Sequence, residues 1–345
     1  MPSEEAALAA RLLRLLLDKD GGNEGALVWH PVLLPLARRN GVLLRVAERF
    51  GEPVLPGPVT DAIASERRRA RDAFALVRHV SRICTEHGIE YLFAKAFQHY
   101  PDVGGDLDLL VLARPAAVDA LLARELSATV APRDLAGRIS GSVTFRVRDG
   151  LTPLDVHHGR IGTVGEHRAY AVMLVRNHRR VMIEGAECGM PWPEDQLVLQ
   201  GVQRISGRRT LRLCDVVSTI TALRDPLDWA YVISLARRVG VLPGLGCYLS
   251  YVEQLHDELF GCPLLPERVR DHLPLAGWGR VAFVHGAYRF PALRVNAKLY
   301  LKQLITGLRA ANWESAARLC LLPLLGAAVA VGRVATPAAP SVESA

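Results

Sequence analysis

The chain has 345 residues, half of them hydrophobic, which excludes a globally disordered protein and leaves room for one large domain or two. The formal charge of +7 allows a polyanionic partner such as RNA, although a mild excess of arginine on a solvated surface explains it more simply. The six cysteines form no Cys-x-x-Cys pair, so a zinc site is not expected. Without the layout of a signal peptide, a cytoplasmic protein with reduced thiols is expected.

The first part of the chain is predicted to be helical. Apolar residues recur at helical spacing over residues 3–17 and 31–50, and residues 60–88 have the pattern of a long amphipathic helix. Its charged segment, residues 66–71, is interpreted as a solvated face. We therefore expect a helical N-terminal region over residues 1–88.

The pattern then changes to short apolar runs. Strands are predicted at 91–96, 107–112, 143–147, 154–158 and 181–183, with a helix at 115–126 that begins at a proline. Strands mixed with few helices indicate an α+β core with a small mixed sheet over residues 89–193.

The remainder is predicted to be mostly helical, with helices at 194–203, 213–223, 228–239 and 248–259. The apolar run at 319–332 is shorter than the roughly 20 residues that a membrane helix needs, so no membrane span is expected. We expect a helical C-terminal domain over 194–333 and a disordered Ala/Pro/Ser-rich tail over 334–345.

Two aspartates at the start of one predicted strand are the strongest chemical signal. Asp106 and Asp108 lie two residues apart, so on a strand both side chains project from the same face. Like charges at this separation repel unless a cation lies between them, and hard carboxylate oxygens suit Mg²⁺. A turn cap before a strand is the simpler alternative, but a metal site is favoured.

Asp155 is the third acidic residue of interest. It lies in the predicted strand 154–158, which is expected to form a hairpin with residues 143–147 through the turn Asp149-Gly150. That pairing would bring Asp155 near Asp106 and Asp108. Three converging carboxylates are what a two-metal phosphoryl or nucleotidyl transfer centre requires, with Asp155 also a candidate to take the proton of the acceptor hydroxyl.

Each of the basic residues near these strands and in the following helical region has two possible interpretations. Lys95 is favoured as a phosphate ligand over an exposed strand end. His157 shares the face of Asp155 and could orient the acceptor or transfer a proton, but a plain strand-end histidine is favoured. An arginine cluster is either a phosphate clamp or a solvated loop; its members are Arg204, Arg208, Arg209 and Arg212. Arg208 and Arg209 are carried forward as the phosphate-binding pair.

The run Gly104-Gly105-Asp106-Leu107-Asp108-Leu109-Leu110-Val111, followed by Leu154-Asp155-Val156-His157, resembles the DNA polymerase β-like nucleotidyltransferase superfamily. More narrowly, residues 93–101, 193–197 and 213–215 resemble a group of little-characterised bacterial and archaeal nucleotidyltransferases. The resemblance covers residues 91–220.

This resemblance implies a sheet that carries the acidic triad and a helical domain that closes over a nucleotide. It implies a nucleoside triphosphate as co-substrate, release of pyrophosphate, and Mg²⁺, with Mn²⁺ as the alternative, held by Asp106, Asp108 and Asp155. Gly104 and Gly105 would let the backbone approach the phosphates.

The leading hypothesis is therefore an enzyme that transfers a nucleoside monophosphate to a small-molecule acceptor. Transfer to RNA, such as a tRNA end, is the alternative that the positive charge allows. A non-catalytic nucleotide-binding or scaffold protein on the same fold is the competing class.

Overall fold

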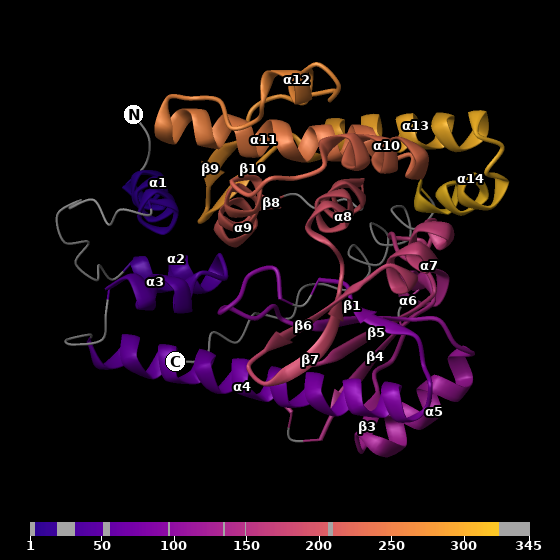
Figure 1. Ribbon diagram of the computed structural model, residues 1–345. Helices are drawn as coiled ribbons and strands as arrows, with labels where there is room; N and C mark the ends of the chain where they lie inside the picture. Colours follow the sequence, from indigo (N-terminus) through magenta and orange to yellow (C-terminus); the bar gives the residue numbers. More distant parts are fainter. Residues whose placement is uncertain are drawn as a thin grey trace, which may run out of the picture.

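The computed structural model describes residues 4–18, 32–50, 56–95, 97–133, 135–148, 150–205 and 210–323. Within these residues a five-stranded mixed sheet lies between the long helix α4 on one side and the C-terminal helices on the other (Figure 1). The predicted α+β architecture, a small mixed sheet flanked by N-terminal and C-terminal helical regions, is confirmed.

The N-terminal helices are α1 (Glu4–Leu17), α2 (Leu33–Arg39), α3 (Leu43–Phe50) and α4 (Gly57–Glu86). The single helix expected over 31–50 is divided after α2, because Gly41 adopts a φ of +63°, a left-handed value that glycine tolerates best. The helix α4 begins earlier than expected, with a proline in its first turn, where a missing N–H has no consequence.

The sheet has the strand order β1-β2-β5-β4-β3. Its strands are β1 (Tyr91–Phe93), β2 (Leu107–Val111), β3 (Ala128–Val130), β4 (Ser142–Val147) and β5 (Leu154–His158). β2 and β5 run parallel, and the other neighbours are antiparallel. The hairpin expected between β4 and β5 is present, while Asp149 in its turn lies outside the described residues.

The elements around the sheet are α5 (Pro115–Glu125), α6 (Leu135–Ser140), α7 (Arg168–Arg176), β6 (Arg179–Ile183) and β7 (Ala186–Met190). β6 and β7 form a separate hairpin, in which β7 contacts β1 and α4. The sequence predicted part of β6 and missed β7.

The C-terminal elements are α8 (Pro193–Ile205), β8 (Thr210–Leu211), α9 (Leu213–Leu223), α10 (Trp229–Val239), α11 (Leu242–Phe260), α12 (Glu267–Arg270), β9 (Ala282–Val284), β10 (Ala287–Arg289), α13 (Ala292–Arg309) and α14 (Trp313–Leu319). In the described part of the chain, no helix is both long and apolar enough to cross a bilayer. The predicted tail at 334–345 and most of the apolar run at 319–332 lie outside the described residues.

Two hydrophobic cores meet at the sheet. One joins the N-terminal helices α1–α3 to α8, α9 and α11, and Leu110 of β2 belongs to it. The other lies between the sheet and α4 and α5, and it contains Leu109 and Val111. Because side chains alternate along a strand, Asp108 projects to the same side as Leu110, toward the C-terminal helices. The domain boundaries at residues 88, 193 and 333 stay a prediction.

Candidate active site

Asp108 and Asp155 lie opposite each other on the neighbouring parallel strands β2 and β5. Adjacent strands are about 4.8 Å apart, so two paired residues on one face bring their carboxylates close together. The flanking pairs, Leu107 with Leu154 and Leu109 with Val156, are fully buried. A shift of one residue would expose those four side chains, so the core fixes the register that juxtaposes the two aspartates.

Asp106 precedes β2 and completes the group, because its side chain lies within hydrogen-bonding reach of that of Asp155. Its carboxylate lies at the open rim, where partial desolvation and the negative charges of Asp108 and Asp155 raise its pKa to about 6. The positive charge of Lys95 lowers the pKa of Asp106 and so partly offsets this rise. Two ionised carboxylates can only accept hydrogen bonds, and the raised pKa of Asp106 indicates that ionising the whole group without a ligand carries a free-energy cost.

This donor set fits a hard divalent cation. Oδ1 of Asp155 is buried and has no hydrogen-bond partner among the described residues, an arrangement that ordinarily carries a free-energy penalty unless another ligand satisfies the oxygen. Carboxylate oxygens are the ligands that Mg²⁺ and Mn²⁺ prefer. Asp106, Asp108 and Asp155 are therefore the residues that would hold such an ion.

Two basic side chains contact Asp108. Nε2 of His157 lies 2.9 Å from Oδ1 of Asp108, and Nζ of Lys95 lies 3.8 Å from the same oxygen. The sequence favoured a plain strand-end histidine at 157; the structure adds that its ring bonds directly to Asp108. Lys95 follows β1 and is about one quarter exposed, so it contacts the carboxylates and keeps access to solvent.

The segment between Lys95 and β2 is held by two ionic anchors. Arg69 of α4 bonds to Glu66 and donates hydrogen bonds to the carbonyl oxygens of Val103 (2.8 Å) and Gly104. The interpretation of residues 66–71 as a merely solvated face is thus wrong for Glu66 and Arg69. Asp102 is the second anchor.

The buried carboxylate of Asp102 accepts hydrogen bonds from the backbone N–H of Leu44 (2.8 Å) and from Nε of Arg45 (3.0 Å) in α3. The loop that delivers Asp106 is therefore tied to two helices. At the tip of this loop, a Cβ on Gly105 would meet no described protein atom within 4 Å. This space leaves the backbone accessible to a ligand.

A second group of polar side chains lies at the start of α9. Oδ1 of Asp215 lies 3.3 Å from Nε2 of His99, and Nε of Arg212 lies 3.7 Å from Oδ2. Burial opposes the charge of Arg212, but neighbouring Cys214, Asp215 and Asp106 raise the pKa of its guanidinium. Arg212 is therefore within electrostatic reach of Asp106.

His99, Cys214 and Asp215 have the chemistry of metal ligands, with one candidate ligand atom from each lying within 4.8 Å of the others, and among the described residues the three aspartates do not lie this close together. Burial and the charge of Asp215 raise the pKa of Cys214 to about 12, so its thiol is protonated in the absence of an ion. The backbone N–H of Arg212 also donates to Asp215 (3.2 Å). The protein supplies the counter-charges of this cluster itself, and it suits a cation less well than the aspartates do.

Arg208 and Arg209, predicted to bind phosphate, lie outside the described residues, as does the side chain of Arg204. Of that cluster, only Arg212 can be placed.

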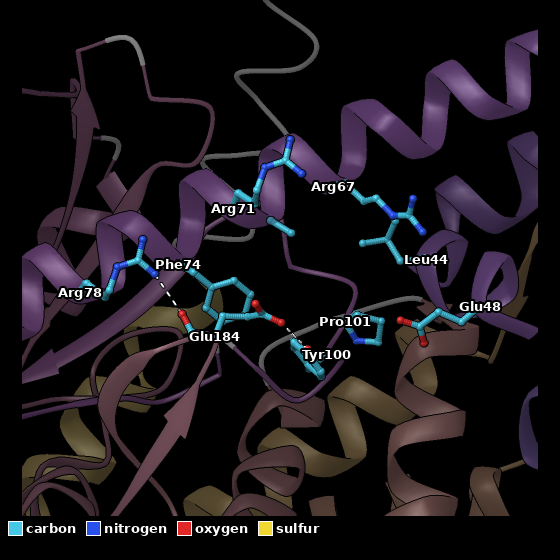
Figure 2. A pocket seen from close by; sticks show the side chains of 10 residues that line it. Leu44, Glu48, Arg67, Arg71, Phe74, Arg78, Tyr100, Pro101 and Glu184 are labelled. Carbon is cyan, nitrogen blue, oxygen red and sulfur yellow. Dashed lines mark hydrogen bonds between the residues drawn. The ribbon is translucent and has the colours of Figure 1, made fainter. Parts of the chain in front are cut away.

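A cavity of about 460 Å³ lies between α3, α4 and the loop that carries Tyr100 (Figure 2). Arg67, Arg71 and Arg78 of α4 line it, and Tyr100 donates a hydrogen bond to Glu184 at 2.6 Å. None of the three aspartates lines this cavity, so it is separate from the carboxylate group.

Comparisons with known proteins agree with the resemblance seen in the sequence. The model of a family described as "Uncharacterised nucleotidyltransferase" matches residues 29–257, about two thirds of the chain. A search of curated proteins finds no significant match.

Solved structures give weaker matches. An antigenic nucleotidyltransferase-like protein from Paracoccidioides brasiliensis is 10% identical, with a TM-score of 0.33 over 45% of this chain and 76% of its own. A tRNA-processing enzyme is 14% identical, with a TM-score of 0.27 over 76% of this chain and 68% of its own. Both TM-scores are below 0.5, so neither similarity supports an assignment.

Proposed function

The chain belongs to this nucleotidyltransferase family, and from that premise we propose that it transfers a nucleoside monophosphate from a triphosphate to a small-molecule acceptor in a Mg²⁺-dependent reaction. The observation that carries the proposal is the in-register pairing of Asp108 with Asp155, with the side chain of Asp106 beside that of Asp155. Three carboxylates that share one face, with an unsatisfied oxygen among them, match the ligand requirement of nucleotidyl transfer.

Asp106, Asp108 and Asp155 would hold the divalent cations, Mg²⁺ or alternatively Mn²⁺. The ions would supply positive charge that stabilises the attacking and leaving oxygens. His157 hydrogen-bonds to Asp108 and thereby fixes the orientation of that carboxylate. The buried register of β2 and β5 holds Asp108 and Asp155 in place before any ligand arrives.

In the proposed step, an acceptor hydroxyl oxygen attacks the α-phosphorus in line with the bond to the β-phosphate. The new P–O bond forms, the bond to the bridging oxygen breaks, and pyrophosphate leaves with that electron pair. Asp155 accepts the hydroxyl proton and later releases it to solvent.

Lys95 is proposed to bind the triphosphate, because its ammonium lies near the carboxylates and remains partly exposed. Gly104 and Gly105 are proposed to let the phosphates approach the backbone, for which the open space at Gly105 leaves room. Arg208 and Arg209 remain proposed phosphate ligands from sequence, and Arg212 joins them because it lies near Asp106.

One observation favours RNA as the alternative acceptor. Arg67, Arg71 and Arg78 are exposed on α4 around the cavity of Figure 2, and exposed arginines bind phosphodiesters. The salt dependence of acceptor binding separates the two cases. An RNA acceptor loses affinity steeply with rising salt, whereas a small acceptor with little charge does not.

The test is to incubate the full chain with each γ-labelled triphosphate, Mg²⁺ and pools of small-molecule or RNA acceptors, and to measure release of labelled pyrophosphate. Release should depend on Mg²⁺ and should be lost in Asp106→Asn. Asp119→Asn is the matched control, because Asp119 bonds to His158 (2.9 Å) on β5, away from the proposed ligands. Activity that survives in Asp106→Asn would remove Asp106 from the mechanism.

A further inference from the structure

A small polar recess lies between the loop after β1 and the helices α8 and α9. It has a volume of about 60 Å³. Its polar lining residues are Gln98, Gln196, Gln200, Ser218 and Thr219, and its apolar ones are Pro193, Leu197, Ala222 and Leu227. Such a slot has room for the edge of a planar ring but not for a whole nucleotide.

The amides of this recess have unmet hydrogen-bonding capacity. Nε2 of Gln200 donates to Oε1 of Gln98 at 2.7 Å. Oε1 of Gln200, Nε2 of Gln98 and Nε2 of Gln196 are buried and have no hydrogen-bond partner among the described residues. Gln200 is 6% exposed, so burying its open acceptor carries a free-energy penalty that a ligand group can remove.

The assignment of the amide atoms does not change this conclusion. If both the Gln98 and Gln200 amides are reversed, Gln98 donates to Gln200, and again one donor and one acceptor stay open. The pair therefore offers an adjacent donor and acceptor in either orientation. Gln196 adds a third amide to the same edge.

A short segment of chain connects the recess to Lys95, which contacts Asp108. Gln98 is three residues from Lys95, so their Cα atoms are at most about 10 Å apart. The adjacent His99 bonds through Nδ1 to Oγ of Ser218 (2.9 Å) in the recess wall and through Nε2 to Asp215. One continuous set of contacts thus connects the recess to the start of α9.

We propose that this recess is the base-recognition subsite, in which Gln98, Gln196 and Gln200 read the hydrogen-bonding edge of the nucleobase of the triphosphate. Every nucleobase carries donors and acceptors side by side along its edge, and amide side chains pair with such an edge through two hydrogen bonds. The apolar walls contact the faces of the ring. This inference rests on the proposed function and adds to it that the enzyme discriminates among bases through these amides.

The experiment measures equilibrium binding of four non-hydrolysable triphosphate analogues, one for each base, to the full chain with Mg²⁺ and no acceptor. Inorganic tripolyphosphate is the fifth probe, because it reports the phosphate contacts alone. The variants are Gln200→Leu and Gln98→Leu, and the second tests the proposal if the buried Gln200→Leu chain does not fold. Gln254→Leu on α11 is the control, since that amide donates to the carbonyl of Gly279 outside the recess.

The wild type should bind one analogue at least about tenfold more tightly than the weakest. Each recess variant should weaken the binding of the preferred analogue by roughly 10- to 100-fold, because a buried hydrogen-bonding group of the base is left unsatisfied. The differences in affinity among the four analogues should become smaller. Tripolyphosphate affinity should not change, and Gln254→Leu should behave as wild type.

Wild-type affinities that are retained in both recess variants would overturn the inference, because the recess would then hold water only. Equal binding of all four analogues by the wild type would overturn it as well. Neither of these results would contradict the proposed nucleotidyl transfer. Failure of the wild type to bind any triphosphate or tripolyphosphate would instead contradict the proposed function itself.

Discussion

This protein has two clusters of acidic and metal-ligand residues, and they differ in how their charge is balanced. In the sheet, Lys95 and His157 contact Asp108, but burial and the mutual repulsion of the three aspartates still raise the pKa of Asp106. At α9, Asp215 has His99 and Arg212 beside it. The comparison teaches that ligand-type residues alone do not define a metal site. A site that needs an ion is one where the protein's own cations do not offset the negative charges.

The largest expected effect is on catalysis at the sheet cluster. Asp155→Asn should lower the rate of pyrophosphate release by on the order of 10³-fold or more, because the ion's stabilisation of the transition state is worth several kcal/mol. A steady-state assay with the best triphosphate measures it. Asp119→Asn, which alters the opposite face of β5, should stay within about twofold of wild type. Equal losses in both variants would mean that the effect is structural.

Lys95 should have an intermediate effect that appears in substrate binding. Lys95→Met keeps most of the side-chain volume but removes a point charge proposed to lie on phosphate, so KM for the triphosphate should rise about tenfold. Initial-rate kinetics separate KM from kcat. A KM that stays unchanged while kcat falls would argue that Lys95 acts only on Asp108.

Arg69 should affect the loop that carries Asp106. Arg69→Gln removes charged hydrogen bonds to two backbone carbonyls, at a cost of about 1–3 kcal/mol, and should lower the melting temperature by a few degrees. The exposed neighbour Arg68 on the same helix provides the control, Arg68→Gln, which should melt within about one degree of wild type. If the two variants melt alike, the anchor does not stabilise the fold.

The smallest expected effect is on the pH dependence of stability in the metal-free protein, and it tests whether the negative charge of Asp106 destabilises the fold. Because the pKa of Asp106 is raised to about 6, the folded state favours its protonated form. Wild type should therefore lose stability relative to Asp106→Asn as the pH rises from about 4 through 6. In EDTA at pH 7.5, Asp106→Asn should melt roughly 1–2 °C higher, and the difference should vanish below about pH 4.

Asp215→Asn should shift the melting temperature in the opposite direction. It weakens the contacts with His99 and Arg212 and the cap on the first turn of α9, so the variant should melt below wild type at pH 7.5. Differential scanning calorimetry of both variants measures the contrast. Stabilisation by Asp215→Asn would remove the distinction between the two clusters.

The parts of the fold that were predictable are those with a local signal. β5 and α9 have the predicted bounds, because short apolar runs are bracketed by turn residues and helical periodicity ends at a clear break. β8, β9 and β10 were missed. β8 is only two residues long, and its partner is distant, since Leu211 pairs with Tyr288. Such pairing leaves no local pattern in the sequence.

In the candidate site, too, the features with a local sequence signal could be predicted and those formed by distant contacts could not. The placement of Asp155 near Asp106 and Asp108 could be inferred from spacing and an expected hairpin, but the parallel pairing of β2 with β5 could not. Arg69 was interpreted as a surface charge, because nothing in helical periodicity reveals a guanidinium that reaches carbonyls 34 and 35 residues away. The glutamines of the recess belong to a loop and a helix that only folding brings together.

The central claim is that Asp106, Asp108 and Asp155 hold divalent cations for nucleotidyl transfer, and electron paramagnetic resonance titration with Mn²⁺ tests it most directly. In the presence of a non-hydrolysable triphosphate, wild type should bind about two Mn²⁺ per chain. Asp155→Asn should lose at least one of them, while Cys214→Ser should bind as wild type does. Unchanged Mn²⁺ binding in Asp155→Asn, or loss of it in Cys214→Ser, would contradict the assignment and move the metal site to α9.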